Sequence, residues 1–274
     1  MTTRRFDDKE LVSRYVKSRF SYPHDLRDII LDYLKKDSRY RPPFGQLIDV
    51  GCGSGQSTPL FADHFQTLIG VDCSQAQIEE ATRRNIHENI EYRIGDSTSL
   101  PMKDESTDLV IVSVALHWFD LQKFYAEVRR ILKPGGLLAV WNYRYFTVHY
   151  DQTPDNTNAI TDVCKKLIDD WFSEIDGHIG PPPKNDNCMA GTPPCFQNEK
   201  RFETAVEMIW SVNELVFYTS TLSSYDILKA KYPDRDISAE TKELLLEALN
   251  FPETAGDTKL LIRFPIHGLL SRKI

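Results

Sequence analysis

The sequence predicts an α/β protein with a mostly parallel sheet of seven strands, helices on both faces and an antiparallel last strand. Short apolar runs alternate with amphipathic helical segments through the first half of the chain. A glycine-rich loop, Gly51-Cys52-Gly53-Ser54-Gly55, directly follows the first apolar run. Acidic residues stand at the ends of the next two runs. A strand, a glycine turn and a helix in this order form a mononucleotide-binding unit.

The N-terminal segment predicts two helices within residues 9–35, with a break at Pro23. The second helix has an apolar face, and the break reads Tyr15-x-x-x-Arg19-Phe20-x-Tyr22-Pro23. Two interpretations stay open at this point: the segment covers a ligand, or it packs on the core without touching one. A linker over residues 38–45, with two prolines, leads to the first strand.

The first strand, residues 46–50, ends at the glycine loop, and a helix is expected over about 57–65 with Thr58 as its N-cap. The loop lacks the third glycine of a dinucleotide fingerprint, because Gln56 takes that position. It also lacks the Gly-Lys-Ser/Thr of a P-loop. Asp49, just before the loop, is poorly placed beside a pyrophosphate and well placed beside a cationic ligand.

The second strand, residues 67–71, ends at Asp72, which lies 21 residues after Gly51. An acid at this spacing hydrogen-bonds ribose hydroxyls in nucleotide-binding sheets. The alternative is that Asp72 caps the next helix, expected over 75–87, although Ser74 can take that place.

The third and fourth strands, residues 90–94 and 107–114, each lead into polar or aromatic residues. Gly95-Asp96-Ser97 follows the third strand, and Ala115-Leu116-His117-Trp118-Phe119 follows the fourth. Ligands in open α/β sheets bind at the carboxyl ends of the strands. His117 and Trp118 therefore either face a ligand or only begin and pack the next helix, expected over 121–132. Lys133-Pro134-Gly135-Gly136 predicts a turn into a fifth strand over 137–142.

The second half of the chain has weaker patterns. The spacing of apolar residues predicts a helix around Ile160–Ile175, a strand over 206–219, and helices over 221–231 and 239–249. A proline-rich loop spans about 180–200, and a last strand over 260–270 is expected near a sheet edge because of Pro265.

The stretch Asp49-Val50-Gly51-Cys52-Gly53-Ser54-Gly55 resembles motif I of the class I S-adenosylmethionine (SAM) dependent methyltransferases. The acid-ended second and third strands and the Leu132-Lys133-Pro134-Gly135-Gly136 turn are similar to later motifs of that family. The resemblance covers roughly residues 45–142. It implies a Rossmann-like fold, SAM as cofactor, Asp72 on the ribose, and Asp96 and Ser97 on the adenine.

From the residues and the resemblance together we expect two groups of site residues. The expected cofactor-binding residues are Tyr15, Arg19, Asp49, Gly51, Cys52, Gly53, Ser54, Asp72, Cys73, Asp96, Ser97 and Ser113. The expected substrate-binding residues are Tyr22, His117, Trp118, Tyr143 and Arg144. No catalytic residue is certain, His117 is a candidate proton acceptor, and no metal site is expected.

Residues Tyr15 to Pro23, Ala115 to Phe119 and the Leu132–Gly136 turn are most similar to the small-molecule branch that includes trans-aconitate methyltransferases. This resemblance implies methyl transfer to an oxygen, carboxylate or hydroxyl, of a small acceptor. Two alternatives stay open: a methyltransferase acting on protein or tRNA, and a SAM-binding protein without turnover.

Composition limits the remaining possibilities. The chain has 274 residues and a net charge of −7, which argues against a nucleic-acid or anionic-membrane partner. Five scattered cysteines and the absence of an apolar run of membrane-spanning length indicate a cytoplasmic protein. We expect a monomer with one domain over 1–274: an N-terminal lid (1–35), a core (about 36–145) and a substrate-covering insert (about 150–258).

Overall fold

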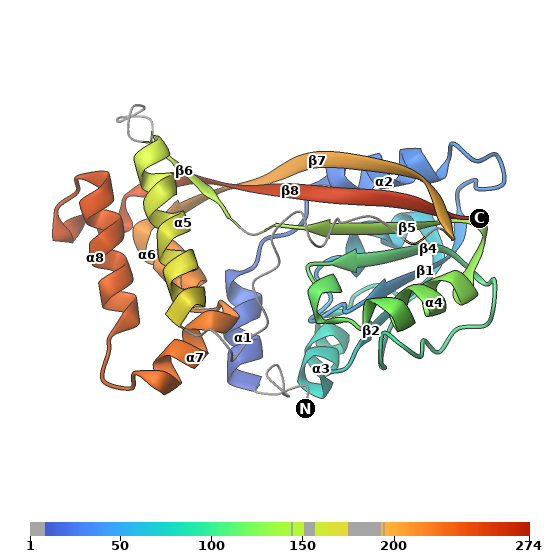
Figure 1. Ribbon diagram of the computed structural model, residues 1–274, viewed down its shortest axis with the longest axis horizontal. Coiled ribbons are helices and arrows are strands. Elements are labelled where there is room, and N and C mark those ends of the chain that lie inside the picture. Colours follow the sequence, from blue (N-terminus) through green and yellow to red (C-terminus); the bar gives the residue numbers. More distant parts are fainter. Residues whose placement is uncertain (1–8, 144, 151–156, 175–192, 194) are drawn as a thin grey trace.

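The computed structural model describes residues 9–143, 145–150, 157–174, 193 and 195–274. Within these residues one sheet has the strand order β3-β2-β1-β4-β5-β8-β6, and β7 also pairs with β8 (Figure 1). The pairs among β1 to β5 are parallel, and every pair that β8 makes is antiparallel. The expected α/β, Rossmann-like fold is therefore confirmed, with eight strands in place of seven.

The first half of the chain forms the parallel part of the sheet close to the expected positions. Because parallel strands are covered on both faces, their central side chains are mostly apolar, as in residues 109–112 of β4. The strands are β1 (Phe44–Val50), β2 (Phe65–Asp72), β3 (Ile90–Ile94), β4 (Thr107–Ser113) and β5 (Leu132–Asn142).

The helices of this half also follow the expected pattern, with one correction. They are α1 (Lys9–Ser18), α2 (His24–Leu34), η1 (Thr58–His64), α3 (Gln75–Arg84), η2 (Leu116–Trp118) and α4 (Leu121–Ile131). The segment η1 is a 3₁₀ helix, and its N-cap residue is Ser57. The prediction of Thr58 as N-cap was wrong because its hydroxyl donates to the buried Asp49 carboxylate instead.

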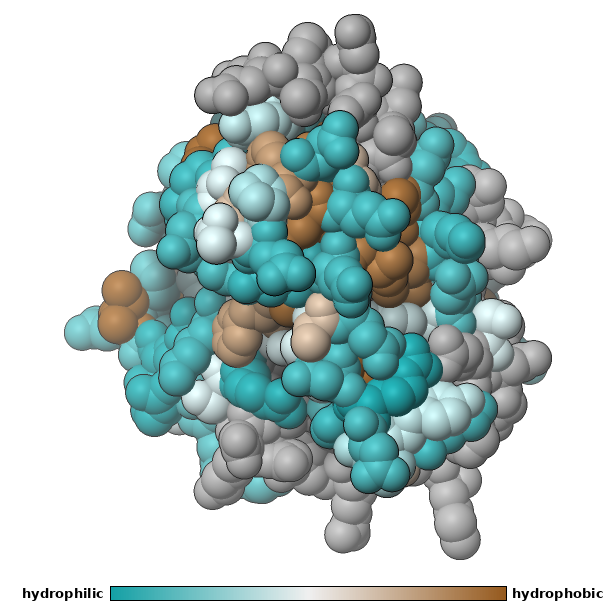
Figure 2. Space-filling view, turned by 90° about the vertical axis from the view of Figure 1, so that its left-hand side faces the viewer, coloured by the Kyte–Doolittle hydropathy of each residue, from teal (hydrophilic) through white to brown (hydrophobic). Residues whose placement is uncertain are grey.

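Among the described residues, the second half adds β6, two long antiparallel strands (β7 and β8) and four α-helices. Figure 1 shows β7 and β8 running across the top of the molecule, from the parallel strands at the right to α5–α8 at the left. Figure 2, which faces that left-hand end, shows a mainly hydrophilic surface with separate apolar patches. The elements are β6 (Thr147–His149), α5 (Thr157–Glu174), β7 (Phe196–Ser211), α6 (Val212–Thr219), α7 (Ser223–Lys231), α8 (Ile237–Leu249), η5 (Glu253–Asp257) and β8 (Lys259–Lys273).

The strand expected over 206–219 is wrong in its second half, which forms helix α6. Ser211 ends β7 and caps α6, with its hydroxyl accepting from the Glu214 N–H and the Glu214 carboxylate accepting from the Ser211 N–H. This capping box stabilises a helix start that apolar spacing alone did not distinguish from a continued strand. Most of the proline-rich loop over 180–200 lies outside the described residues, and residues 196–200 belong to β7.

Strand β8 lies next to the edge strands β6 and β7, as Pro265 indicated, but is itself internal. β8 pairs with β7 on one side and with β5 and then β6 on the other. Pro265 faces Ala205 of β7, and on the opposite side neither β5 nor β6 pairs with residues 264–266. A proline is tolerated in a central strand where one side of the ladder is locally interrupted.

Two apolar cores lie on the two faces of the sheet. One joins α2 and the N-terminal segment to β8 and α6, through residues such as Ile30, Phe20 and Phe264. The other joins α4 to the opposite face of the parallel strands. No helix among the described residues has the length and apolar character to cross a membrane. The strand order reverses between β1 and β4, which places a ligand crevice at their carboxyl ends.

Candidate functional site

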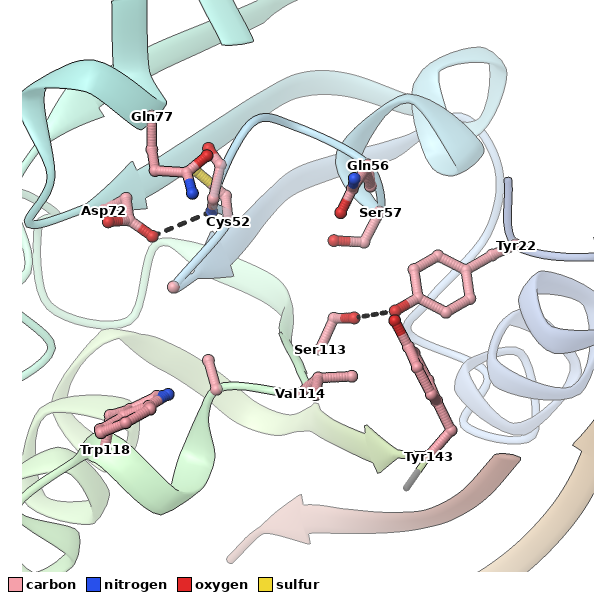
Figure 3. Close-up of a pocket in the computed structure, with 13 residues that line it drawn as sticks. Tyr22, Cys52, Gln56, Ser57, Asp72, Gln77, Ser113, Val114, Trp118 and Tyr143 are labelled. Atoms are coloured by element: carbon pink, nitrogen blue, oxygen red, sulfur yellow. Dashed lines mark hydrogen bonds between the residues drawn. The ribbon is translucent and has the colours of Figure 1, made fainter. Parts of the chain in front are cut away.

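A pocket open to solvent lies at this crevice (Figure 3). Its walls come from the glycine loop, the ends of β2, β4 and β5, and the segment between α1 and α2. The lining residues are Tyr22, Gly51, Cys52, Gly53, Gln56, Ser57, Asp72, Gln77, Ser113, Val114, Ala115, Trp118 and Tyr143.

The glycine loop presents bare backbone to this pocket. Gly51 and Gly53 have φ of +73° and +53°, a left-handed conformation that glycine adopts without strain. A Cβ at Gly51 would lie 2.6 Å from the Ala115 Cβ, so the loop is tightly packed there. A Cβ at Gly53 would meet only Gln77 Oε1, at 3.8 Å. The loop is therefore open towards the pocket at Gly53.

Asp72 lies beside the open part of the loop. One of its carboxylate oxygens accepts from the Gly53 N–H at 2.9 Å and the other from the Ser74 N–H at 2.9 Å. The N-cap of α3 is Ser74, whose hydroxyl accepts from the Gln77 N–H, so the alternative of Asp72 as helix cap does not hold. The carboxylate instead fixes the loop against the end of β2 and reaches the pocket wall.

Asp49 is fully buried, one layer behind the pocket wall. Its Oδ2 accepts from the Ser57 hydroxyl at 2.6 Å and from the Thr58 hydroxyl at 2.7 Å. Burial raises the pKa of this carboxyl to about 6, against the lowering effect of the two hydroxyl donors. Asp49 was expected beside a cationic ligand, but it is not on the pocket wall; it contacts Ser57, which is.

The opposite end of the pocket is aromatic and carries hydroxyl groups. The Tyr22 and Ser113 hydroxyls share a hydrogen bond of 2.6 Å. The Tyr22 ring packs edge-on against Trp141, with centroids 5.7 Å apart. Tyr143 packs against Phe20 at 5.0 Å, and Figure 3 shows its hydroxyl turned towards those of Tyr22 and Ser113. Three hydroxyls from distant parts of the chain thus gather at this end.

Trp118 and His117 lie at the start of the segment after β4. Trp118 lines the pocket although 47% of the residue is exposed, and its ring lies 4.8 Å from the His117 ring. His117 is exposed to solvent and is absent from the lining. Desolvation of the ring lowers the His117 pKa to about 4. The imidazole is therefore mainly neutral at pH 7.

Several expected cofactor residues lie off the lining. The exposed Asp96 accepts at 2.7 Å from the Thr98 N–H and at 2.6 Å from the Thr98 hydroxyl. Ser97 and Cys73 follow strand ends without reaching the pocket. Ser54 is buried and lines a second hollow, which it shares with Gly55 and Tyr92.

The remaining candidates are Tyr15 and Arg19 of the N-terminal segment, and Arg144. Arg19 lies over the Tyr218 ring of α6, with its guanidinium 4.9 Å from the ring centroid. Tyr15 belongs to α1, and its side chain lies outside the description, as does the whole of Arg144. Two aromatic residues of the second half lie away from the pocket: Trp171 is buried against Tyr225, and Tyr145 donates to Asp169 at 2.5 Å.

Five lining residues were missed from the sequence: Gln56, Ser57, Gln77, Val114 and Ala115. Gln77 could have been predicted from the sequence, because it stands in the first turn of the helix that follows Asp72. Gln77 Oε1 and Gln56 Nε2 are buried and have no hydrogen-bond partner among the described residues. The pocket wall thus holds one acceptor and one donor that a polar ligand can satisfy.

The chain is 32% identical, over 277 aligned residues, to a protein of Dictyostelium discoideum named as a methyltransferase, and the match covers 99% of this chain and 97% of that one. The chain belongs to the SAM-dependent methyltransferases. A family model described as a methyltransferase domain matches residues 48–140.

Two further matches agree with this methyltransferase family. CRG1 of Saccharomyces cerevisiae, named as a SAM-dependent methyltransferase, is 30% identical over 136 residues, covering 48% of this chain and 45% of that one. A solved structure described as a type II methyltransferase from Anaeromyxobacter dehalogenans has a TM-score of 0.69 at 24% identity. It covers 93% of this chain and 97% of that chain, which confirms the fold.

The cofactor of this methyltransferase is SAM, and the pocket has features that suit it. The open backbone at Gly53 leaves room for a ligand where a Cβ would otherwise project. The unpartnered Gln77 and Gln56 atoms suit a ligand with both donors and acceptors, as SAM has. No cluster of three or more His, Cys, Asp or Glu that could hold a metal ion occurs among the described residues.

Proposed function

We propose that this methyltransferase transfers the methyl group of SAM to an oxygen atom of a small acceptor, as in the trans-aconitate-type branch. The observation that carries the proposal is the division of the pocket into two ends. Asp72 and Gln77 lie beside the glycine loop at one end, and Tyr22, Ser113 and Tyr143 gather at the other (Figure 3).

The loop end is the proposed cofactor site. The backbone of Gly51, Cys52 and Gly53 would lie against the ligand, and Asp72 would accept from the ribose hydroxyls. The buried Asp49 would act on the cationic end of the ligand through Ser57 and through its charge. Tyr15, Arg19, Ser54, Cys73, Asp96 and Ser97 stay predicted cofactor residues on the resemblance alone.

The hydroxyl end is the proposed acceptor site. Tyr22, Tyr143 and Trp118 would cover the acceptor with aromatic surface and exclude water, and the hydroxyls would orient its polar group. Asp72 is the only charged side chain among the described lining residues. A carboxylate acceptor suits this wall because it attacks the sulfonium methyl without first losing a proton. SAM supplies that electrophilic methyl, and the chain supplies alignment.

His117 becomes relevant if the acceptor is a hydroxyl compound. Its neutral imidazole next to Trp118 would then accept the proton that the nucleophile loses. Arg144 stays a predicted anion-binding residue. The monomeric state, the cytoplasmic location and the division into lid, core and insert likewise stay predictions.

A methyl-acceptor screen tests the proposal. The protein is incubated with SAM labelled in the methyl group and a panel of small carboxylic acids, phenols and alcohols, with total yeast tRNA and denatured casein as macromolecular probes. We expect label in a small acid, in a base-labile methyl ester. Label only in tRNA or casein would overturn the small-molecule assignment. Binding of SAM with no transfer to any probe would favour a non-catalytic SAM-binding protein.

A further inference from the structure

One lining residue has a backbone conformation that its side chain disfavours. The described non-glycine residues with positive φ are Glu105, Val114, Asn198 and Asn250. Asn250 ends α8 in the left-handed conformation common at helix ends, and Asn198 lies at a register shift of β7. Val114, with φ of +53°, is the β-branched member of the group, for which this region is most strained. It is also the one that lines the pocket.

The surrounding structure holds Val114 in this conformation from both sides. Its N–H donates to the Trp141 carbonyl of β5 at 2.9 Å, one position beyond the Ser113–Trp141 pairing. Ser113 is bound to Tyr22 on one side, and Ala115 is buried beneath Gly51 on the other. Strain of this kind persists where neighbours leave the backbone no alternative, and it concentrates at functional sites.

The left-handed turn changes which side chains reach the pocket. In an extended strand, successive side chains point to opposite faces, so the residue after Ser113 would point away from it. Here Ser113, Val114 and Ala115, three consecutive residues, all line the same pocket. In the view of Figure 3, Val114 lies between Trp118 and the two tyrosines.

We propose that Val114 is a specificity-determining residue whose branched side chain limits the size of the methyl acceptor beside Ser113 and Tyr143. This proposal rests on the proposed function, a small acceptor bound at the hydroxyl end. An acceptor that packs against the Val114 methyl groups has an apolar carbon at that position, next to the oxygen that receives the methyl group of SAM. The strain is retained because it places an apolar side chain where an extended strand would place none.

Two substitutions distinguish the effect of the Val114 side chain from the effect of its strained backbone. Val114→Ala removes the branched end of the side chain and keeps a residue with a Cβ at positive φ. Val114→Gly removes the side chain and also relieves the strain. Val140→Ala, in the core strand β5 and away from the pocket, is the matched control for loss of the same atoms.

The measurements are kcat/KM for straight-chain, branched and aryl carboxylic acids, Kd for S-adenosylhomocysteine by calorimetry, and thermal midpoints. We expect both Val114 variants to shift preference towards bulkier acids by about tenfold or more, as pocket methyl groups do in other enzymes. We expect an unchanged Kd for S-adenosylhomocysteine. We also expect Val114→Gly to melt at or above the wild-type temperature, with Val140→Ala lower in stability and unaltered in preference.

The outcomes that overturn the proposal are distinct. Unaltered preference in both Val114 variants of an active enzyme would overturn the specificity role. A Kd for S-adenosylhomocysteine weakened about tenfold would make Val114 a cofactor contact instead. A lower melting temperature for Val114→Gly than for Val114→Ala would remove the argument from strain. A wild-type enzyme that methylates no small molecule would refute the proposed function first, and this proposal with it.

Discussion

The Tyr22 hydroxyl, from the segment between α1 and α2, lies 2.6 Å from the Ser113 hydroxyl at the carboxyl end of β4. Tyr22 is buried against Trp141 and Phe20, so the ring is held independently of this hydrogen bond. The bond therefore ties the N-terminal segment to the sheet at the pocket and fixes the direction of two hydroxyls that face it.

Removing the Tyr22 hydroxyl should affect acceptor binding more than folding. Tyr22→Phe keeps the ring contacts and loses a hydrogen bond worth about 1 kcal/mol, so we expect KM for the acceptor to rise several-fold with little change in the melting temperature. Ser113→Ala should act similarly, and the double variant should cost less than the sum because both remove one interaction. Initial rates at saturating SAM measure this.

Tyr40→Phe is the control, because the Tyr40 hydroxyl donates to the Pro134 carbonyl at 3.0 Å, away from the pocket lining. It should lower stability and leave KM unchanged. Equal KM changes in the Tyr22 and Tyr40 variants would mean that the effect is one of general stability.

Asp72→Ala should weaken SAM binding by about 1–3 kcal/mol, because ribose hydroxyls and the Gly53 N–H would lose their acceptor. Calorimetric titration with SAM gives the affinity. Asp236→Ala is the matched control: it removes a carboxylate that accepts from the Ala239 N–H at 3.0 Å and caps α8. That variant should lose about 1 kcal/mol of stability and keep its SAM affinity. Unchanged affinity in Asp72→Ala would exclude it as the ribose ligand.

Asp49 should make the free protein less stable as pH rises. Burial raises the pKa of Asp49 to about 6 from an ordinary 3.8, so the folded state binds this proton more tightly than the unfolded state. The stabilisation that this proton binding gives the folded state is therefore fully present below about pH 4 and is lost as pH rises through about 6. Above that pH, Asp49 causes no further change in stability.

Asp49→Asn cannot titrate and isolates this effect from the other carboxyl groups. From pH 4 to pH 7 the stability of the variant relative to wild type should rise by up to about 3 kcal/mol. Urea unfolding of the cofactor-free proteins at each pH measures the difference. A difference that stays constant with pH would show that Asp49 titrates at its ordinary value.

Gly53→Ala should reduce SAM affinity beyond its effect on folding. The added methyl would sit at φ of +53° and project towards Gln77, into the pocket. We expect a stability loss of about 1–2 kcal/mol from the left-handed backbone. We expect SAM affinity to fall by more than about tenfold because the methyl occupies ligand space.

Gly135→Ala provides the comparison for this strain, since Gly135 has φ of +76° in β5, between the paired residues Leu132 and Leu137, where a Cβ would meet the Arg39 side chain. It should lose stability and bind SAM normally. If both variants bound SAM equally well, the backbone at Gly53 would not be a ligand surface.

Much of the nucleotide-binding half was predictable because its signals are local. The apolar runs placed β1 to β4 within a few residues, since a buried parallel strand must be apolar along its length. Positive φ at Gly51 and Gly53 also follows from the sequence, because glycine is the residue that adopts it freely. The switch from β7 to α6 at Ser211 was missed, because a capping box within an apolar run leaves the spacing almost unchanged.

By itself, the sequence determined the fold and the strand ends at which ligands bind, because these depend on residue type and spacing along short segments. Its resemblance to a known family implied the cofactor. Only the tertiary structure decided which side chains form the aromatic, hydroxyl-bearing end of the pocket, where we propose that the acceptor binds. Tyr22, Ser113 and Tyr143 meet there from separate parts of the chain, Asp49 turns away towards Ser57, and Val114 turns inward. The physical reason is that a side chain's direction at a strand end depends on the neighbours that pack against it, and those neighbours come from distant segments.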